Sequence, residues 1–186
     1  VSFAKDESPE DGNGHGTHVA GIIAGSGASS GGKYKGVAPG ASLMNIKVLN
    51  NEGYGQASSI MEGIEYAVDN GAQIISMSFG KDFSPQKQWV DDAFRYAESK
   101  NVLLVKAAGN DAKNIDTEPN FPTDEINGKE IADNFLSIGA LNKEYGANMV
   151  ASFSNFGKAN VDIFSPGNEI YATIPNNKYK YLQGTS

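Results

Sequence analysis

The sequence contains no cysteine, so disulfide bonds and thiol chemistry contribute nothing to its fold or function. No hydrophobic run approaches the ~20 residues that cross a bilayer, and we expect no transmembrane segment in this chain. The 15 Lys and Arg residues are outnumbered by 22 Asp and Glu residues, and the net charge of -7 argues against nucleic-acid binding through backbone phosphates. Only two histidines are present, which limits the metal sites that the chain could build.

The sequence of 186 residues has the composition of one globular domain, with 39% hydrophobic and 20% charged residues. Apolar runs typical of buried strands alternate with segments of helical periodicity. This order predicts an α/β fold with a mostly parallel sheet and helices on both faces. The predicted strands are Ala41–Leu49, Gln73–Phe79, Asn101–Ala107, Phe135–Ala140 and Val161–Phe164, and the predicted helices are Ala57–Asp69 and Pro85–Lys100.

A Gly-rich turn around His15 leads into a helix of small residues that ends near Gly25. An imidazole titrates near neutral pH without any shift of its pKa, so His15 is a candidate general base. His18 lies one helical turn further on, and the two rings could together bind a metal ion. The chain has no cysteine and no third histidine, so a metal would need carboxylates such as Glu7 or Asp11 as further ligands. We disfavour the metal site because of this shortage of ligands. A histidine with a purely structural role is the other alternative.

Two further motifs carry groups that could complete a hydrolytic site. Asn110 follows a predicted strand and a glycine, where its amide could donate to a developing oxyanion, an interaction worth about 2.7–4 kcal/mol. Asparagine is also common in ordinary turns. Ser186 follows Gly184 and Thr185, and at the start of a helix its hydroxyl would be exposed and its N–H free. A serine beside a neutral histidine can become a nucleophile.

Together these three motifs resemble those of the subtilisin-like serine proteases, the subtilase or peptidase S8 family, and they occur in that family's order. The motifs are GHGTHVAG at 14–21, AAGN at 107–110 and GTS at 184–186, and the likeness continues through GVAPGASL at 36–43 and ASFSNFG at 151–157. The resemblance implies a serine endopeptidase that works through an acyl-enzyme. His15 would be its base, Asn110 its oxyanion donor and Ser186 its nucleophile.

The resemblance also implies where an extended peptide or protein substrate would bind. One edge of the substrate would pair with Gly53, Tyr54 and Gly55. The other edge would pair with Ser78, Phe79 and Gly80, which also form one wall of the pocket for the residue before the scissile bond. Ala107, Ala108 and Gly109 would form the opposite wall, and Phe79 suggests that this pocket is apolar.

The sequence departs from the family at its catalytic aspartate, which lies in an Asp-[Ser/Thr]-Gly motif. No such motif precedes His15, and Asp6 and Asp11 are the only upstream aspartates; Asp11 belongs to the His motif and is not assigned that role. We therefore expect residues 1–186 to be a partial peptidase domain, incomplete at both ends, that associates with the remainder of its own polypeptide. Losing the aspartate costs about 10⁴ in kcat in the serine protease template, so this chain alone should be nearly inactive.

No organic cofactor is implied, and calcium is possible but not supported by the sequence. Many subtilases bind calcium in the loop after the His helix, here Gly25–Gly36, which has no Asp, Glu or Asn and carries Lys33 and Lys35. The long acidic stretch Asp111–Asp133 is interpreted as a solvated surface insertion, in preference to a specificity or metal-binding role. The family resemblance implies an exported protein, either extracellular or in the cell envelope.

Two other classes of function compete with the protease. A non-catalytic subtilase-like domain would keep the cleft and bind peptides without cutting them. A nucleotide-binding α/β domain would need a Gly-rich phosphate loop between a strand and a helix, and no strand precedes Gly12–Gly16.

Overall fold

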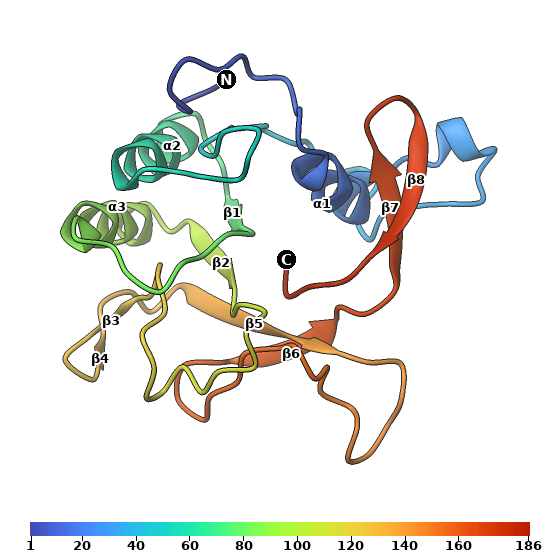
Figure 1. The fold of residues 1–186 in the computed structure, drawn as a ribbon. Helices are drawn as coiled ribbons and strands as arrows, with labels where there is room; N and C mark the ends of the chain where they lie inside the picture. Colours follow the sequence, from blue (N-terminus) through green and yellow to red (C-terminus); the bar gives the residue numbers. More distant parts are fainter.

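A parallel four-stranded sheet in the order β1-β2-β5-β6 forms the centre of the structure (Figure 1). The computed structural model describes residues 1–186, apart from the side chain of Ser29. Main-chain pairing sets Met77 beside Lys106, Leu104 beside Phe135 and Ile138 beside Ile163. The predicted α/β fold with a parallel sheet is confirmed. The strands are β1 (Ile74–Met77), β2 (Leu103–Ala107), β5 (Phe135–Leu141) and β6 (Ile163–Pro166).

Helices α2 (Ala57–Asp69) and α3 (Lys87–Ser99) pack against each other and cover one face of this sheet. The core between these helices and the sheet is apolar, and Phe94 of α3 and Leu104 of β2 are fully buried in it. The opposite face of the sheet carries apolar side chains that this chain leaves open. Ile74 on β1 and Ile163 on β6 are 62% and 52% exposed.

Helix α1 (His15–Ala24) packs away from these helices, against the antiparallel hairpin of β7 (Ile170–Ile174) and β8 (Lys178–Leu182) (Figure 1). The hairpin turn places Asn176 and Asn177 at positive φ, a conformation that asparagine tolerates better than most residues. We did not predict this hairpin, although the alternation of tyrosine with other residues around Asn-Asn is a hairpin signal. The remaining elements are η1 (Ala28–Ser30), β3 (Glu125–Ile126) and β4 (Lys129–Glu130).

One of the predicted strands is wrong. The segment Ala41–Leu49 forms no strand, and only Lys47 makes an isolated bridge, to Ser2. The Lys47 carbonyl accepts the Phe3 N–H at 2.8 Å, and the Lys47 N–H donates to the Val1 carbonyl at 3.0 Å. The segment is therefore bonded to the N-terminal residues at one point without forming a ladder. The other four strands and both helices are confirmed, with boundaries shifted by at most two residues.

The interpretation of Asp111–Asp133 as a solvated insertion is also wrong. Ile115, Phe121 and Ala132 in this stretch are each less than a tenth exposed, and the last two belong to the main core. The Asp116 carboxylate accepts hydrogen bonds from three consecutive backbone N–H groups, those of residues 158–160. The stretch is therefore held to the rest of the fold by a few buried apolar residues and by the Asp116 turn contact, despite its acidic composition.

The packing of α1 on the hairpin gives a stability prediction at Gly21. A Cβ added there would lie 2.1 Å from Thr173 Oγ1 and 3.1 Å from the Thr173 backbone nitrogen. We expect Gly21→Ala to lower the free energy of unfolding by about 1–3 kcal/mol in urea titrations, because the overpacked helix must move away from β7.

Gly16→Ala in the same helix is the matched control. Its Cβ would make only an ordinary contact, 3.7 Å from Asp11 Oδ2. We expect this variant to be as stable as the wild type or more stable by up to about 1 kcal/mol, since alanine favours helix over glycine. Equal effects of the two substitutions would contradict the assigned packing of α1.

Candidate active site

The Asp11 carboxylate fixes the start of the helix that carries His15. It accepts the Gly14 N–H at 2.7 Å, the Thr17 N–H at 2.8 Å and the Thr17 hydroxyl at 2.6 Å. Gly14 takes a left-handed conformation at the helix N-cap, with φ 94°. These bonds satisfy N–H groups that an α-helix leaves free at its first turn, so the sequence Asp-Gly-Asn-Gly-His sets the position of the imidazole.

His15 is half-buried at the first position of α1. Burial lowers the pKa of His15 below its ordinary value, the Asp11 carboxylate partly offsets this, and nearby His18 lowers it further. A lowered pKa keeps the imidazole neutral at neutral pH, which is the form that accepts a proton. Among the described residues, no carboxylate is hydrogen-bonded to the His15 ring.

The second histidine of the motif supports the hairpin. His18 is buried, and its Nε2 lies 3.1 Å from the Lys180 carbonyl on β8, to which only a protonated nitrogen can donate. The Thr173 hydroxyl on β7 donates to the Thr17 carbonyl at 2.9 Å. Across the described residues, no three His, Cys, Asp or Glu side chains are placed to hold a metal ion. His18 thus holds α1 on the hairpin through its Nε2.

The Asn110 amide is held in one orientation by Thr185. Its Oδ1 accepts the Thr185 N–H at 2.9 Å and the Thr185 hydroxyl at 3.1 Å. The same hydroxyl accepts the Gly109 N–H at 3.0 Å. Because Oδ1 is bonded twice, Nδ2 is the group left for an external acceptor, and it donates to no described residue. Both Asn110 and Ser186 are exposed, and the chain end that carries Ser186 lies, in the view of Figure 1, between α1 and the β1–β2 pair.

The two predicted pocket walls lie side by side. Since Met77 pairs with Lys106, the segments 78–80 and 107–109 leave neighbouring strands in the same direction. Asn120 and Phe121 bridge them: Asn120 Nδ2 donates to the Ala108 carbonyl at 3.2 Å, and Phe121 pairs with Lys81. Phe79 is half-buried and packs against the main core.

The third predicted substrate segment forms a turn at the molecular surface. The Asn50 N–H donates to the Tyr54 carbonyl, and the Asn50 side chain accepts the Tyr54 N–H, both at 2.8 Å. Gly53 has φ 87° and Tyr54 is 73% exposed. The turn is therefore preorganised by Asn50 and presents Tyr54 to solvent.

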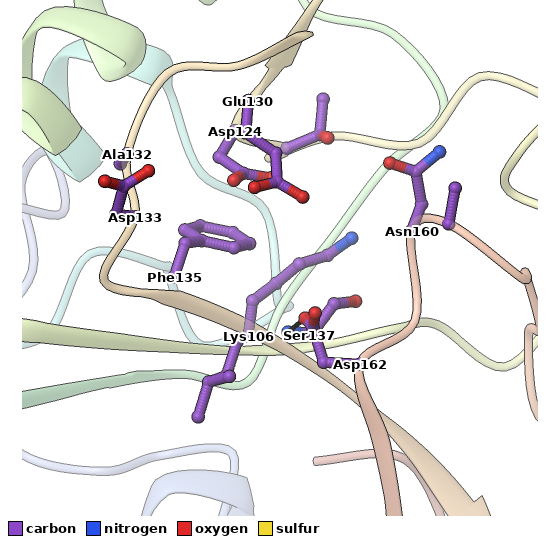
Figure 2. A pocket seen from close by; sticks show the side chains of 12 residues that line it. Lys106, Asp124, Glu130, Ala132, Asp133, Phe135, Ser137, Asn160 and Asp162 are labelled. Carbon is purple, nitrogen blue, oxygen red and sulfur yellow. Dashed lines mark hydrogen bonds between the residues drawn. The ribbon is translucent and has the colours of Figure 1, made fainter. Parts of the chain in front are cut away.

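A cavity of about 170 Å³ lies on the helix-covered face, beside the segment that bridges the walls (Figure 2). The Lys106 ammonium points into it toward Asp124 and Glu130, and donates a hydrogen bond to Asn120 Oδ1. Burial lowers the pKa of Lys106 to about 8, and the Asp124 carboxylate partly offsets this effect. Burial raises the pKa of Asp124 to about 6, and the Glu130 and Asp162 carboxylates add to the rise. Sequence reasoning missed this charged cavity, because the acidic stretch was expected to be solvated.

An asparagine amide fixed next to a serine, at the carboxyl edge of a parallel sheet, fits the class of serine hydrolases, because such an amide can stabilise a developing oxyanion. Comparison with known proteins narrows this class. The model of the subtilase family (peptidase S8) matches residues 2–186. The chain therefore belongs to the subtilase family of serine proteases.

Individual relatives agree with this assignment. Thermitase of Thermoactinomyces vulgaris is 38% identical over 97% of this chain and 59% of its own length. Subtilisin DY of Bacillus licheniformis is 39% identical over 100% of this chain and 63% of its own length. Among solved structures, that of sphericase has a TM-score of 0.79 and 32% identity, covering 94% of this chain and 59% of its own. The chain thus spans about three fifths of the length of these relatives.

The electrostatics of the His motif give a prediction for Asp11. Asp11→Asn removes the negative charge that raises the pKa of His15 and keeps an acceptor for the first turn of α1. We expect the pKa of His15 to fall further below its ordinary value, so that the neutral imidazole persists to more acidic pH. An NMR titration of the His15 Cε1–H resonance measures this. Asp6→Asn, which removes another upstream carboxylate, should leave the titration unchanged, and an unchanged or raised pKa in Asp11→Asn would contradict the assignment.

Proposed function

We propose that the protein containing this chain is a serine endopeptidase that cleaves extended protein substrates through an acyl-enzyme. The fixed amide of Asn110 is the observation that carries this proposal. An oxyanion donor must be oriented before the reaction begins, and the two Thr185 bonds to Oδ1 provide that orientation.

In the proposed reaction the Ser186 hydroxyl attacks the scissile carbonyl while neutral His15 takes its proton. The carbonyl oxygen becomes negative, and Asn110 Nδ2 and the Ser186 N–H donate to it. His15 then returns the proton to the leaving amine. In the second half of the reaction His15 takes a proton from water, which attacks the acyl-enzyme, and the proton is then given back to Ser186. No cofactor takes part.

The carboxylate that orients His15 is proposed to come from a part of the polypeptide outside this chain. Asp11 is already committed, since both its oxygens accept hydrogen bonds from the first turn of α1. This proposal is supported by the longer chains of the relatives. The same remainder would cover the open face of the sheet, where Ile74 and Ile163 are exposed. The chain by itself would then be nearly inactive.

We propose that substrate lies between the Gly53–Gly55 turn and the 78–80 segment, pairing its backbone with both. The side chain before the scissile bond would enter between the two walls and meet the Asn120–Phe121 bridge. We propose that the base of this pocket is polar, because Asn120 is bonded to Lys106 and to the Ala108 carbonyl. This differs from the apolar pocket that Phe79 suggested, since Phe79 packs into the core.

We propose no calcium role for the Gly25–Gly36 loop. The loop contains Lys33 and Lys35, and the Gly27 carbonyl already accepts the N–H groups of Ser30 and Gly32. None of the described helices is long and apolar enough to span a membrane. Export stays a prediction, because one relative, 39% identical to this chain, is named the major intracellular serine protease of Bacillus subtilis.

Labelling with a fluorophosphonate tests this function in the full-length polypeptide that contains the chain. We expect the probe to modify Ser186, because a hydroxyl activated by a neighbouring base attacks phosphorus, and mass spectrometry of the labelled peptide to identify the site. Ser186→Ala should abolish the label, while Ser165→Ala, at an exposed serine on β6, should keep it. A folded polypeptide that takes no label would contradict the proposed protease activity and favour a non-catalytic peptide-binding domain.

A further inference from the structure

Asn155 is a fully buried amide that lies against the loop carrying Asn110. It is 0% exposed, and its side chain bonds to the backbone on both sides of Asn110. Nδ2 donates to the Ala108 carbonyl at 2.9 Å. Oδ1 accepts the N–H groups of Asp111 at 2.9 Å and Lys113 at 3.0 Å.

The backbone at Asn155 adds a fourth bond to this loop. Its N–H donates to the Gly109 carbonyl at 2.8 Å. A Cβ added to Gly109 would lie 2.2 Å from Asn155 Nδ2, and Gly109 has φ 109°. The amide thus packs directly on the Gly109 backbone, and only glycine combines that close approach with that conformation.

Asn155 is itself anchored to the central sheet. The neighbouring Ser154 hydroxyl accepts the Ala140 N–H from β5 at 2.9 Å and donates to the Asn155 carbonyl at 2.8 Å. Ser154 is buried, as is Ala140. A continuous set of buried and part-buried hydrogen bonds therefore runs from β5 through Asn155 to the residues before and after Asn110.

The three side-chain bonds require the chemistry of asparagine. One oxygen must accept two N–H groups while the same side chain donates to a carbonyl, which an amide can do and a carboxylate cannot. Alanine would leave the Asp111 and Lys113 N–H groups without their acceptor and would remove one of the two amides that donate to the Ala108 carbonyl, the other being Asn120.

We propose that Asn155 is a positioning residue for the oxyanion donor: it sets the backbone on which the Asn110 amide is aimed. This role rests on the proposed function and goes beyond it, since Asn155 touches neither substrate nor the reacting atoms. Thr185 fixes the side chain of Asn110 through its two bonds to Oδ1, and Asn155 fixes the backbone on either side of Asn110.

A double-mutant cycle on a chromogenic peptide amide, in the full-length polypeptide, tests this role. Asn110→Ala should lower kcat by about 10²–10³. Asn155→Ala should lower kcat by up to about 10² with KM unchanged, because a donor displaced by about 1 Å loses most of its effect on the transition state. In the Asn110→Ala background the Asn155→Ala substitution should have no further effect on kcat, since the group that it positions is gone.

Asn160→Ala is the matched control. This amide anchors the following stretch through the Ile115 carbonyl and Glu125, away from Asn110, and should leave kcat unchanged. If Asn155→Ala does not fold, the isosteric Asn155→Asp, which loses the donor to Ala108, gives the same comparison.

Two results would overturn the positioning role: an equal loss of kcat in both backgrounds, or no loss in the single variant. Either can occur in an enzyme whose wild type hydrolyses the peptide and takes label at Ser186, so the proposed function would survive. A folded wild type without hydrolysis and without label would overturn both.

Discussion

The hydrogen bonds from Thr185 to the side-chain oxygen of Asn110 are the interaction on which the candidate site depends. They join the loop after β2 to the segment after β8, across 75 residues of sequence. Because Ser186 is the next residue, this one contact sets the proposed nucleophile and the proposed oxyanion donor relative to each other. Such preorganisation is the largest single contribution to many enzymatic rate enhancements, because the donors need not reorient as charge develops.

The β7–β8 hairpin also positions His15, the proposed general base, because helix α1 packs against it. Helix α1 begins at His15 and docks on the hairpin through Gly21 and Thr173, and through His18 and the Lys180 carbonyl. Four residues after β8 the same chain reaches Ser186. In this account the proposed base and nucleophile are both positioned by one pair of strands, while the sheet and the buried amide of Asn155 hold the proposed oxyanion donor.

Features of the fold and the candidate site could be predicted from the sequence where they depend on residues close together in the chain. Helices α2 and α3 and strand β2 were predicted because their apolar periodicity is local, and His15, Asn110 and Ser186 because each stands in a short motif. The docking of α1 on β7, the burial of Phe121 and the charged cavity at Lys106 depend on partners far away in the sequence. Segment Ala41–Leu49 has the composition of a strand, but a strand also needs a neighbouring strand to pair with along its length, and in the structure only Lys47 is paired.

The same limit applies to Asn155. Its motif, ASFSNFG, is part of the family resemblance. Nothing local, however, distinguishes an ordinary turn residue from a buried amide that bonds a loop 42 to 47 residues upstream. Only the fold shows that its amide is hydrogen-bonded to Ala108 and Asp111, on either side of Asn110 in the sequence.

The most direct test of the account is a crystal structure of the full-length polypeptide with a peptidyl boronate bound to Ser186. The tetrahedral boronate places an oxygen where the oxyanion would develop. The account predicts Asn110 Nδ2 within about 2.7–3.1 Å of that oxygen, with Oδ1 still bonded to Thr185. A boronate oxygen beyond hydrogen-bonding distance of Nδ2, or an Asn110 amide turned away from Thr185, would contradict it.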